Sequence, residues 1–331
     1  MKAFIRNKTR ELILIGVIVI MSAVITSIAP PFLTALNLIN ILNNNAILGI
    51  MATGMMVVIV TGNIDVSVGA EFAMVTMLTA TYVKALGEAS STLVGLMIGL
   101  AIGTALGLMN GLLVATMRLP AIVVTLGTLN VIRGTMYYVT KGKWVDGLEG
   151  PLVLLANTKL FQIPMTVYIW LAVLILTYFL LYHTKIGRDI LAVGGNKIAA
   201  QRIGISDVKA YLCAFGYIGA LTGLAAVLSV SRLRIAQATN GLGYEMKLIA
   251  ATVIGGTMFS GGVASILGTF LGILLMGVIE NGLVLSKVPV HWQSLATGLI
   301  LIIAVASSAF NRRSGDKRGK KKTAARKEAE A

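Results

Sequence analysis

Carboxyl groups inside apolar stretches are the side chains of this sequence best suited to chemistry. Asp65, Glu71 and Glu280 lie in or beside hydrophobic runs, where a charge is costly and marks a functional candidate by default. Asp65 interrupts two such runs, so it can instead cap the following helix by accepting bonds from the amide of Ser67 and the next residue. We favour the cap, with Ser67 and Gly69 allowing close backbone approach.

Enzyme signatures are missing from the sequence. The phosphate loop G-x-x-x-x-G-K-[ST] does not occur, so the chain is not expected to hydrolyse ATP. His183 and His291 have neither triad nor metal-ligand spacing, and the single cysteine, Cys213, excludes an internal disulfide. We therefore expect no catalytic residue, no metal site and no cofactor bound by this chain.

Composition places the chain in a membrane. It is 56% hydrophobic and 12% charged, whereas about a quarter of the residues of a soluble domain are charged. The net charge of +15 comes from bases at the N-terminus, in short loops and in the tail 311–331. This distribution is typical of cytoplasmic segments, so nucleic acid is not expected as a partner.

Ten hydrophobic stretches approach the roughly 20 residues that a helix needs to cross a bilayer. We therefore expect an all-α polytopic membrane protein with about ten transmembrane helices and both termini in the cytoplasm. Residues 32–44, polar on one face, are expected to form a helix at the outer interface. The expected spans are residues 12–28, 46–60, 66–83, 93–116, 121–139, 165–181, 211–230, 246–258, 263–282 and 293–310.

Two units follow from these stretches. Residues 1–310 form the membrane domain, and residues 311–331, with nine Lys/Arg and three Asp/Glu, have the composition of a disordered cytoplasmic tail attracted to anionic lipid.

A two-fold pseudo-repeat is suggested by two pairs of strings. GNIDVSVG (62–69) and GGTMFSGG (255–262) share two glycines and a serine at equal spacing, and Asn110-Gly111-Leu112 resembles Asn281-Gly282-Leu283. Transporters place broken helices at corresponding positions of their two halves, near the pathway. For the glycines helix packing is the favoured role, and for Asn110 and Asn281 it is cross-helix hydrogen bonding. The pathway or gate candidates are Asp65, Ser67, Gly69, Asn110, Gly255, Gly256, Gly261, Gly262 and Asn281.

A basic segment, TKIGRDILAVGGNKIAAQRIGI (184–205), separates two of the expected spans. Its pattern predicts a break and cap at Gly194-Gly195-Asn196, a short helix over 197–202 and an end at Gly204. A short cytoplasmic helix between two spans could be bound by a soluble partner that moves the membrane helices. The alternative is a plain connecting loop.

Four strings in order resemble one family. They are GNIDVSVG (62–69), LPAIVVTLGTLNVIRG (119–134), the segment 184–205, and GLGYEMKLIAATVIGGTMFSGG (241–262). Together they resemble the permease subunits of bacterial ABC importers of the ribose/xylose/arabinose type, over about residues 31–310. KGKWVDGL (141–148) and the Asn-Ile-Asp form of the first string look closest to the autoinducer-2 and rhamnose branches.

That resemblance implies a permease subunit that translocates a ribose-like pentose, a methylpentose or the sugar-derived signal autoinducer-2 across the bacterial cytoplasmic (inner) membrane. It implies a separate ATPase subunit that binds ATP and Mg, an extracytoplasmic solute-binding protein, and a second permease chain, identical or related. The implied ATPase-coupling residues are Gly194, Gly195, Asn196, Lys197, Ala199, Gln201, Arg202 and Gly204.

The alternative function is a proton-coupled secondary transporter of a small polar solute. Asp65, Glu71 or Glu280 would then carry the proton. The scarcity of charges inside the apolar stretches speaks against it.

Overall fold

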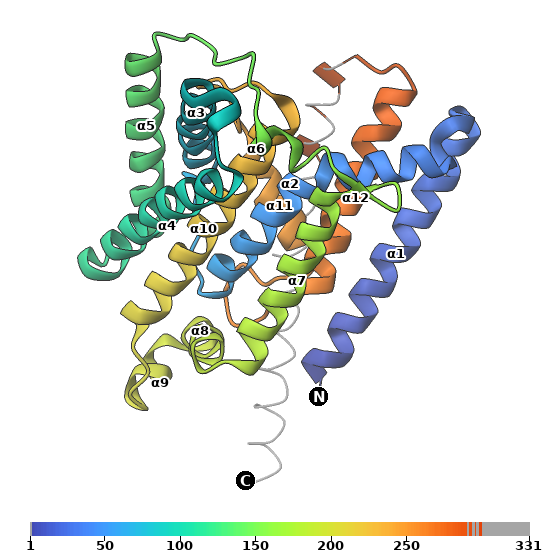
Figure 1. The fold of residues 1–331 in the computed structure, drawn as a ribbon. Coiled ribbons are helices and arrows are strands. Elements are labelled where there is room, and N and C mark those ends of the chain that lie inside the picture. Colours follow the sequence, from blue (N-terminus) through green and yellow to red (C-terminus); the bar gives the residue numbers. More distant parts are fainter. Residues whose placement is uncertain (1, 290, 293–294, 296–297, 300–331) are drawn as a thin grey trace, which may run out of the picture.

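The computed structural model describes residues 2–289, 291–292, 295 and 298–299 (Figure 1). Within them the fold is helical, and the strands that occur are one antiparallel pair of two residues each. The elements are α1 (Lys2–Ile28), η1 (Pro30–Leu33), α2 (Ala35–Val60), α3 (Val68–Leu86), η2 (Gly87–Ala89), α4 (Thr92–Met117), α5 (Ala121–Thr140), α6 (Pro151–Leu154), β1 (Lys159–Leu160), β2 (Ile163–Pro164), α7 (Met165–His183), α8 (Lys185–Gly195), α9 (Lys197–Arg202), α10 (Asp207–Leu233), α11 (Tyr244–Ile254) and α12 (Ile266–Leu285).

Seven of the described helices are long and apolar enough to cross a membrane, namely α1, α2, α4, α5, α7, α10 and α12. The all-α polytopic architecture is thereby confirmed, but the count of ten is not. α3 has 19 residues but carries Glu71 and Lys84. α11 has 11 residues and is much shorter than a bilayer core of about 30 Å. The expected span 293–310 lies largely outside the described residues, and the tail 311–331 lies wholly outside them.

The helical bundle has two opposite ends, which α9 and α6 mark. Figure 1 shows the start of α1 and the pair α8–α9 at one end of the molecule, and α6 at the other. We call the first the α9 end. The expected placement of the N-terminus and the basic segment 184–205 on one side agrees with this arrangement.

α2 and α10 form the centre of the fold. In their apolar windows 89% and 78% of the residues are buried, against 11% for α1 and 22% for α4. α10 packs against α2, α3 and α4. Because lipid can cover apolar side chains, α1 and α4 can leave most of their surface outside the bundle while α2 and α10 position the interior.

Glycines bring α4 and α10 into backbone contact. They recur every four residues on one buried face of α4, at Gly95, Gly99, Gly103 and Gly107. A Cβ atom at Gly103 would overlap the carbonyl oxygen of Gly219 in α10, and a Cβ atom at Gly219 would overlap that of Gly103. Small residues at this spacing are the usual means by which membrane helices approach closely.

The asparagine-rich residues 32–44 do not form a helix separate from the following span, and that part of the expectation is wrong. From Ala35 onward they belong to the continuous helix α2. Their polar groups form hydrogen bonds to other helices. The side-chain amides of Asn37 and of Asn281 in α12 donate to each other's oxygen at 2.9 and 3.0 Å. Asn43 accepts a 2.6 Å bond from Thr166 of α7. These partners hold the polar face against the bundle.

The expected pseudo-repeat is not confirmed. Its first pair of strings does occupy similar places, since 61–67 joins α2 to α3 and 255–265 joins α11 to α12. The second pair does not correspond. Asn110 lies on α4, the second long helix after its break, whereas Asn281 lies on α12, directly after the other break.

Candidate functional site

The segment 184–205 forms two short helices at the α9 end. The Thr184 hydroxyl accepts the amide of Gly187 at 3.1 Å, where α8 begins. The side-chain oxygen of Asn196 accepts the amide of Ala199 at 3.0 Å, where α9 begins, and Gly204 follows α9 with φ of +81°. The predicted cap, helix and end are confirmed, while α8 is an additional helix that the pattern did not indicate.

α9 presents an exposed surface of mixed chemistry. Ala200 is buried against the bundle, and a 2.7 Å ion pair joins Lys197 to Asp207 of α10. The hydrogen bond to Asp207 raises the pKa of Lys197, so the ammonium is charged at neutral pH. Ile198 and Ile203 are 65% and 76% exposed. Also exposed are the candidate coupling residues Gly195, Asn196, Ala199, Gln201, Arg202 and Gly204.

The C-terminal end of α8 touches both helix breaks through backbone atoms. A Cβ atom at Gly194 would overlap the carbonyl oxygen of Val60, the last residue of α2, and lie 2.8 Å from the amide of Gly262. That amide donates a 2.8 Å bond to the same Val60 oxygen. A Cβ atom at Gly261 would lie 2.6 Å from the Gly194 oxygen. We call Val60, Gly194, Gly261 and Gly262 the glycine junction.

The four glycine candidates of the second break have different positions. Gly261 and Gly262 belong to the junction and have φ of +85° and +78°, which favour glycine. Gly255 lies instead against α12, where a Cβ atom would overlap the carbonyl of Gly268. Gly256 has φ of +99° and follows directly. Gly261 and Gly262 therefore contact α8, whereas Gly255 allows α11 and α12 to approach each other closely.

A second group of candidates forms a buried acid cluster, consisting of Asp65, Ser67, Glu71, Asn110 and Thr128. Each member is at most 8% exposed. The Ser67 hydroxyl lies 2.5 Å from Asp65 and 3.0 Å from Glu71. The Asn110 amide donates to Ser67 at 2.8 Å and to Glu71 at 2.9 Å, and Thr128 donates to Asn110 at 2.7 Å. The cluster thus ties the first break to α3, α4 and α5.

The cluster has fewer hydrogen-bond donors than its two carboxyl groups have oxygen atoms to accept them. The single hydroxyl proton of Ser67 faces two carboxyl groups. The second oxygen of Asp65 and that of Glu71 are buried and have no partner within the described part of the chain. Because two buried carboxylates side by side repel each other, we expect one of them to be protonated. The amide of Ser67 does bond to Asp65, at 2.9 Å, but Ser67 rather than Asp65 directly precedes α3.

Glu71→Gln is expected to leave the free energy of unfolding within about 1 kcal/mol of the wild type, because an amide oxygen in place of Oε1 can still accept from both Asn110 and Ser67. Glu71→Ala is expected to cost roughly 1–3 kcal/mol, because it leaves buried polar partners unsatisfied. Thermal unfolding of the purified protein in detergent measures both. Equal losses in the two variants would contradict this account.

The remaining polar candidates lie away from the acid cluster. Asn281 pairs with Asn37, as described above. Glu280 forms a 2.7 Å ion pair with Lys247 of α11. Of the three acids considered as proton carriers, Glu280 is therefore ion-paired. Asp65 and Glu71 both contact the hydroxyl group of Ser67. Among the described residues no group of three His, Cys, Asp or Glu side chains could hold a metal ion.

Arg133 was not among the candidates, although it lies at the centre of a contact. It is 9% exposed, and its guanidinium donates to the carbonyl oxygens of Ala238, Asn240 at 2.9 Å and Gly69 at 3.2 Å. A Cβ atom at Gly69 would overlap the carbonyl oxygen of Gly241. The signal in the sequence was a lone arginine in an apolar stretch, which is a functional candidate on physical grounds.

Arg133→Lys is expected to destabilise the protein by roughly 1–3 kcal/mol, because an ammonium cannot span three carbonyls and leaves buried acceptors unpaired. Arg118→Lys is the matched control, since Arg118 is exposed after α4. Thermal unfolding distinguishes them, and equal melting temperatures would show that the three bonds contribute little.

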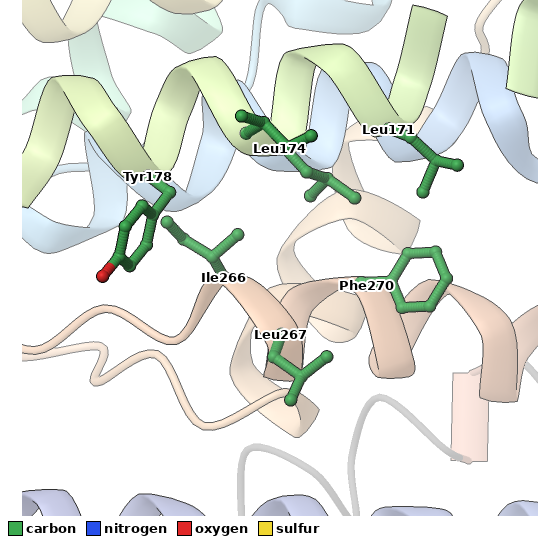
Figure 2. A pocket seen from close by; sticks show the side chains of 7 residues that line it. Leu171, Leu174, Tyr178, Ile266, Leu267 and Phe270 are labelled. Atoms are coloured by element: carbon green, nitrogen blue, oxygen red, sulfur yellow. The ribbon is translucent and has the colours of Figure 1, made fainter. Parts of the chain in front are cut away.

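An apolar groove of about 360 Å³ lies between α7 and the start of α12. Figure 2 shows its lining, to which Tyr178 brings the one hydroxyl. It contains none of the candidate residues. A groove lined almost wholly by apolar side chains does not suit a polar solute, so we place no site there. The lining residues are Leu171, Leu174, Ile175, Tyr178, Ile266, Leu267 and Phe270.

Comparison with known families gives the chain its place. The family model described as "Branched-chain amino acid transport system / permease component" matches residues 37–305. The chain belongs to this family. Both helix breaks, α8–α9, the acid cluster and Arg133 all fall within the matched residues.

Curated relatives cover most of the chain. The ribose import permease protein RbsC of Escherichia coli K12 is 35% identical over 298 residues, 87% of this chain and 90% of the relative. The autoinducer 2 import system permease protein LsrC of Klebsiella pneumoniae is 35% identical over 302 residues, 91% and 86%. RbsC of Bacillus subtilis is 36% identical over 288 residues, 86% and 88%. No solved structure matches the chain.

Proposed function

We propose that this permease is the membrane-spanning subunit of an ATP-driven ABC importer for a monosaccharide, a ribose-like pentose or methylpentose, or for autoinducer-2. One observation carries the proposal: the exposed surface of α9 is continuous, through α8 and the glycine junction, with both helix breaks. The names of the ribose and autoinducer-2 relatives support the choice of solute.

The mechanism follows from this connection. An ATPase that binds α9 differently in its two states can shift the equilibrium of the bundle only through contacts that differ between them. Movement of α8 acts on Val60 and on Gly262 together, because both contact Gly194. The first break then moves against the acid cluster, and the second moves against α12. The coupling residues named from the sequence lie at the end of α8, on α9 or just beside it, and all of them except Gly194 are exposed.

The proposed partners complete the importer. A separate ATPase chain binds ATP and Mg and docks on the α9 end, which faces the cytoplasm together with both termini. A solute-binding protein delivers the solute to the opposite end, and a second permease chain, identical or related, completes the pathway in the bacterial inner membrane. Anionic lipid attracts the basic tail 311–331.

The test of function is uptake into proteoliposomes that contain this chain, the ATPase and the solute-binding protein encoded beside it. Ribose, rhamnose and autoinducer-2 are supplied with and without ATP. Uptake that requires ATP and every component is expected. Uptake by this chain alone, driven by a pH gradient, would replace the importer with a proton-coupled transporter.

Docking on α9 has a separate test. Ile198→Glu is expected to lower co-purification of the ATPase at least about tenfold, because it places an unpaired charge in the proposed interface. Leu154→Glu is the matched control, since Leu154 of α6 is 60% exposed at the opposite end and Ile198 is 65% exposed. Equal co-purification of the two variants would remove α9 from the interface.

A further inference from the structure

The connection between α10 and α11, residues 234–243, runs deep into the fold, and we call it the strap. In the sequence it lies between the expected spans 211–230 and 246–258. Near its start, Ala236 exchanges two backbone bonds of 2.8 and 2.9 Å with Val145. Lys84, in the last turn of α3, donates to the carbonyl oxygen of Asp146 at 2.9 Å. The strap therefore begins beside the C-terminal end of α3.

Five residues later the strap has reached the other end of α3. A Cβ atom at Gly241 would lie 2.7 Å from the carbonyl oxygen of Gly69, in the first turn of α3. Gly69 and Lys84 are 15 residues apart, which is about 22 Å along a helix. Between these two contacts the backbone turns: the amide of Asn240 donates to the carbonyl oxygen of Gln237 at 3.0 Å, and that of Leu242 donates to Thr239 at 3.2 Å. The strap thus connects the two ends of α3 through turns, without a regular helix or strand of its own.

The strap has an apolar face that packs inward. Ala236 and Ala238 are buried in a cluster with residues of α3 and α5, among them Ala70, Val83 and Ile132. The polar side chains of the strap lie away from this face. Gln237 and Asn240 are partly exposed, and Thr239 is exposed. Arg133 fixes the backbone from the buried side through the carbonyl oxygens of Ala238 and Asn240.

Irregular backbone is not tolerated against lipid, because hydrocarbon cannot satisfy its polar groups. It persists at membrane depth only where protein buries it or where it lines a water-filled cavity. One face of the strap is buried by α3 and α5, and the opposite face carries Thr239 in the open. The polar face therefore belongs to an aqueous space.

The charges around the strap offset one another. The guanidinium of Arg133 is directed to carbonyl oxygens, and the carboxylate of Glu245 attracts it. The second oxygen of Glu245 is buried without a described hydrogen-bond partner, beside Gly69. The partly exposed side chains of the strap, in contrast, are amides and a hydroxyl that both donate and accept hydrogen bonds, which suits the hydroxyl groups of a neutral polyol.

We propose that the strap lines the translocation pathway and that Gln237, Thr239 and Asn240 bind the hydroxyl groups of the sugar-like solute as it passes. The proposal rests on the proposed importer function for its solute class. The placement of the strap against water rests on the fold alone, so the two are tested by different measurements.

The first measurement is the accessibility of a cysteine. Thr239→Cys is introduced with Cys213→Ala, and the complex with its ATPase and binding protein is treated with a charged, membrane-impermeant methanethiosulfonate. We expect rapid labelling, slowed several-fold by saturating ribose. Val131→Cys is the control, because Val131 is 68% exposed in the middle of α5, a helix apolar enough to cross a membrane, and should react only with a lipid-soluble maleimide. Thr239→Cys that behaves like Val131→Cys would overturn the proposal.

The second measurement is transport. Thr239→Val removes one hydroxyl at nearly constant volume and is expected to lower ribose uptake about tenfold, with ATP hydrolysis in the presence of loaded binding protein within about twofold of the wild type. Thr116→Val is the control, since the exposed Thr116 bonds only within α4 among its described contacts. Unchanged uptake in Thr239→Val would overturn solute binding. Wild-type complex without ATP-dependent uptake would refute the importer, while the labelling result would still decide the placement of the strap.

Discussion

Gly194→Ala is expected to lower ATP-driven uptake at least about tenfold. The added methyl group would overlap the carbonyl oxygen of Val60 and lie 2.8 Å from the amide of Gly262. Neither neighbour is a flexible side chain, so the backbone of α8 must move away from both breaks. Overpacking of this kind costs roughly 1–3 kcal/mol. We expect α9 still to bind the ATPase, because its exposed surface is unchanged, but the bond between Gly262 and Val60 to weaken.

Gly195→Ala is the matched control. It is the same substitution one residue later in the same segment, and the nearest atom to its Cβ position is the Cα of Gly262 at 4.0 Å. Uptake, ATPase co-purification and melting temperature are measured for both variants in the complete complex. Uncoupled ATP hydrolysis in Gly194→Ala alone would support transmission through the junction. Equal uptake in the two variants would refute it.

Gly219→Ala is expected to lower the free energy of unfolding by roughly 1–3 kcal/mol and to reduce the yield of folded protein. Its Cβ atom would overlap the carbonyl oxygen of Gly103 across the contact between α4 and α10. α10 is central, and it also contacts α2 and α3, so a shift at this contact reaches the elements that hold the acid cluster. Thermal unfolding in detergent measures the loss.

Gly127→Ala provides the comparison. Gly127 also lies within a long apolar helix, α5, but no atom approaches its Cβ position within 4 Å. Alanine is favoured over glycine in a helix by about 1 kcal/mol, so this variant should be as stable as the wild type or more so. A melting temperature for Gly219→Ala as high as that of Gly127→Ala would show that α4 and α10 are not held in backbone contact.

Local patterns in the sequence determined the helical class and several of the parts. Apolar runs of membrane length predicted α4, α5, α7, α10 and α12 to within four residues at each end, because the length of a spanning helix is set by the bilayer and not by its neighbours. The cap at Asn196 and the end at Gly204 were predictable because capping depends on adjacent residues. The glycines of α4 repeat every four residues and could have been recognised as a packing face.

Only the tertiary structure decided how these parts meet. Spacing in the sequence cannot show that Gly194 touches Val60 and Gly262, because these residues are far apart in the chain and approach through backbone atoms with no side-chain signature. It also could not show that Asp65 and Glu71 share Ser67 with Asn110 of another helix. Residues 231–243 were known from the sequence only as the connection between two expected spans. Their course between the two ends of α3 depends on Arg133, whose three carbonyl partners exist only once α3, α5 and the strap are packed together.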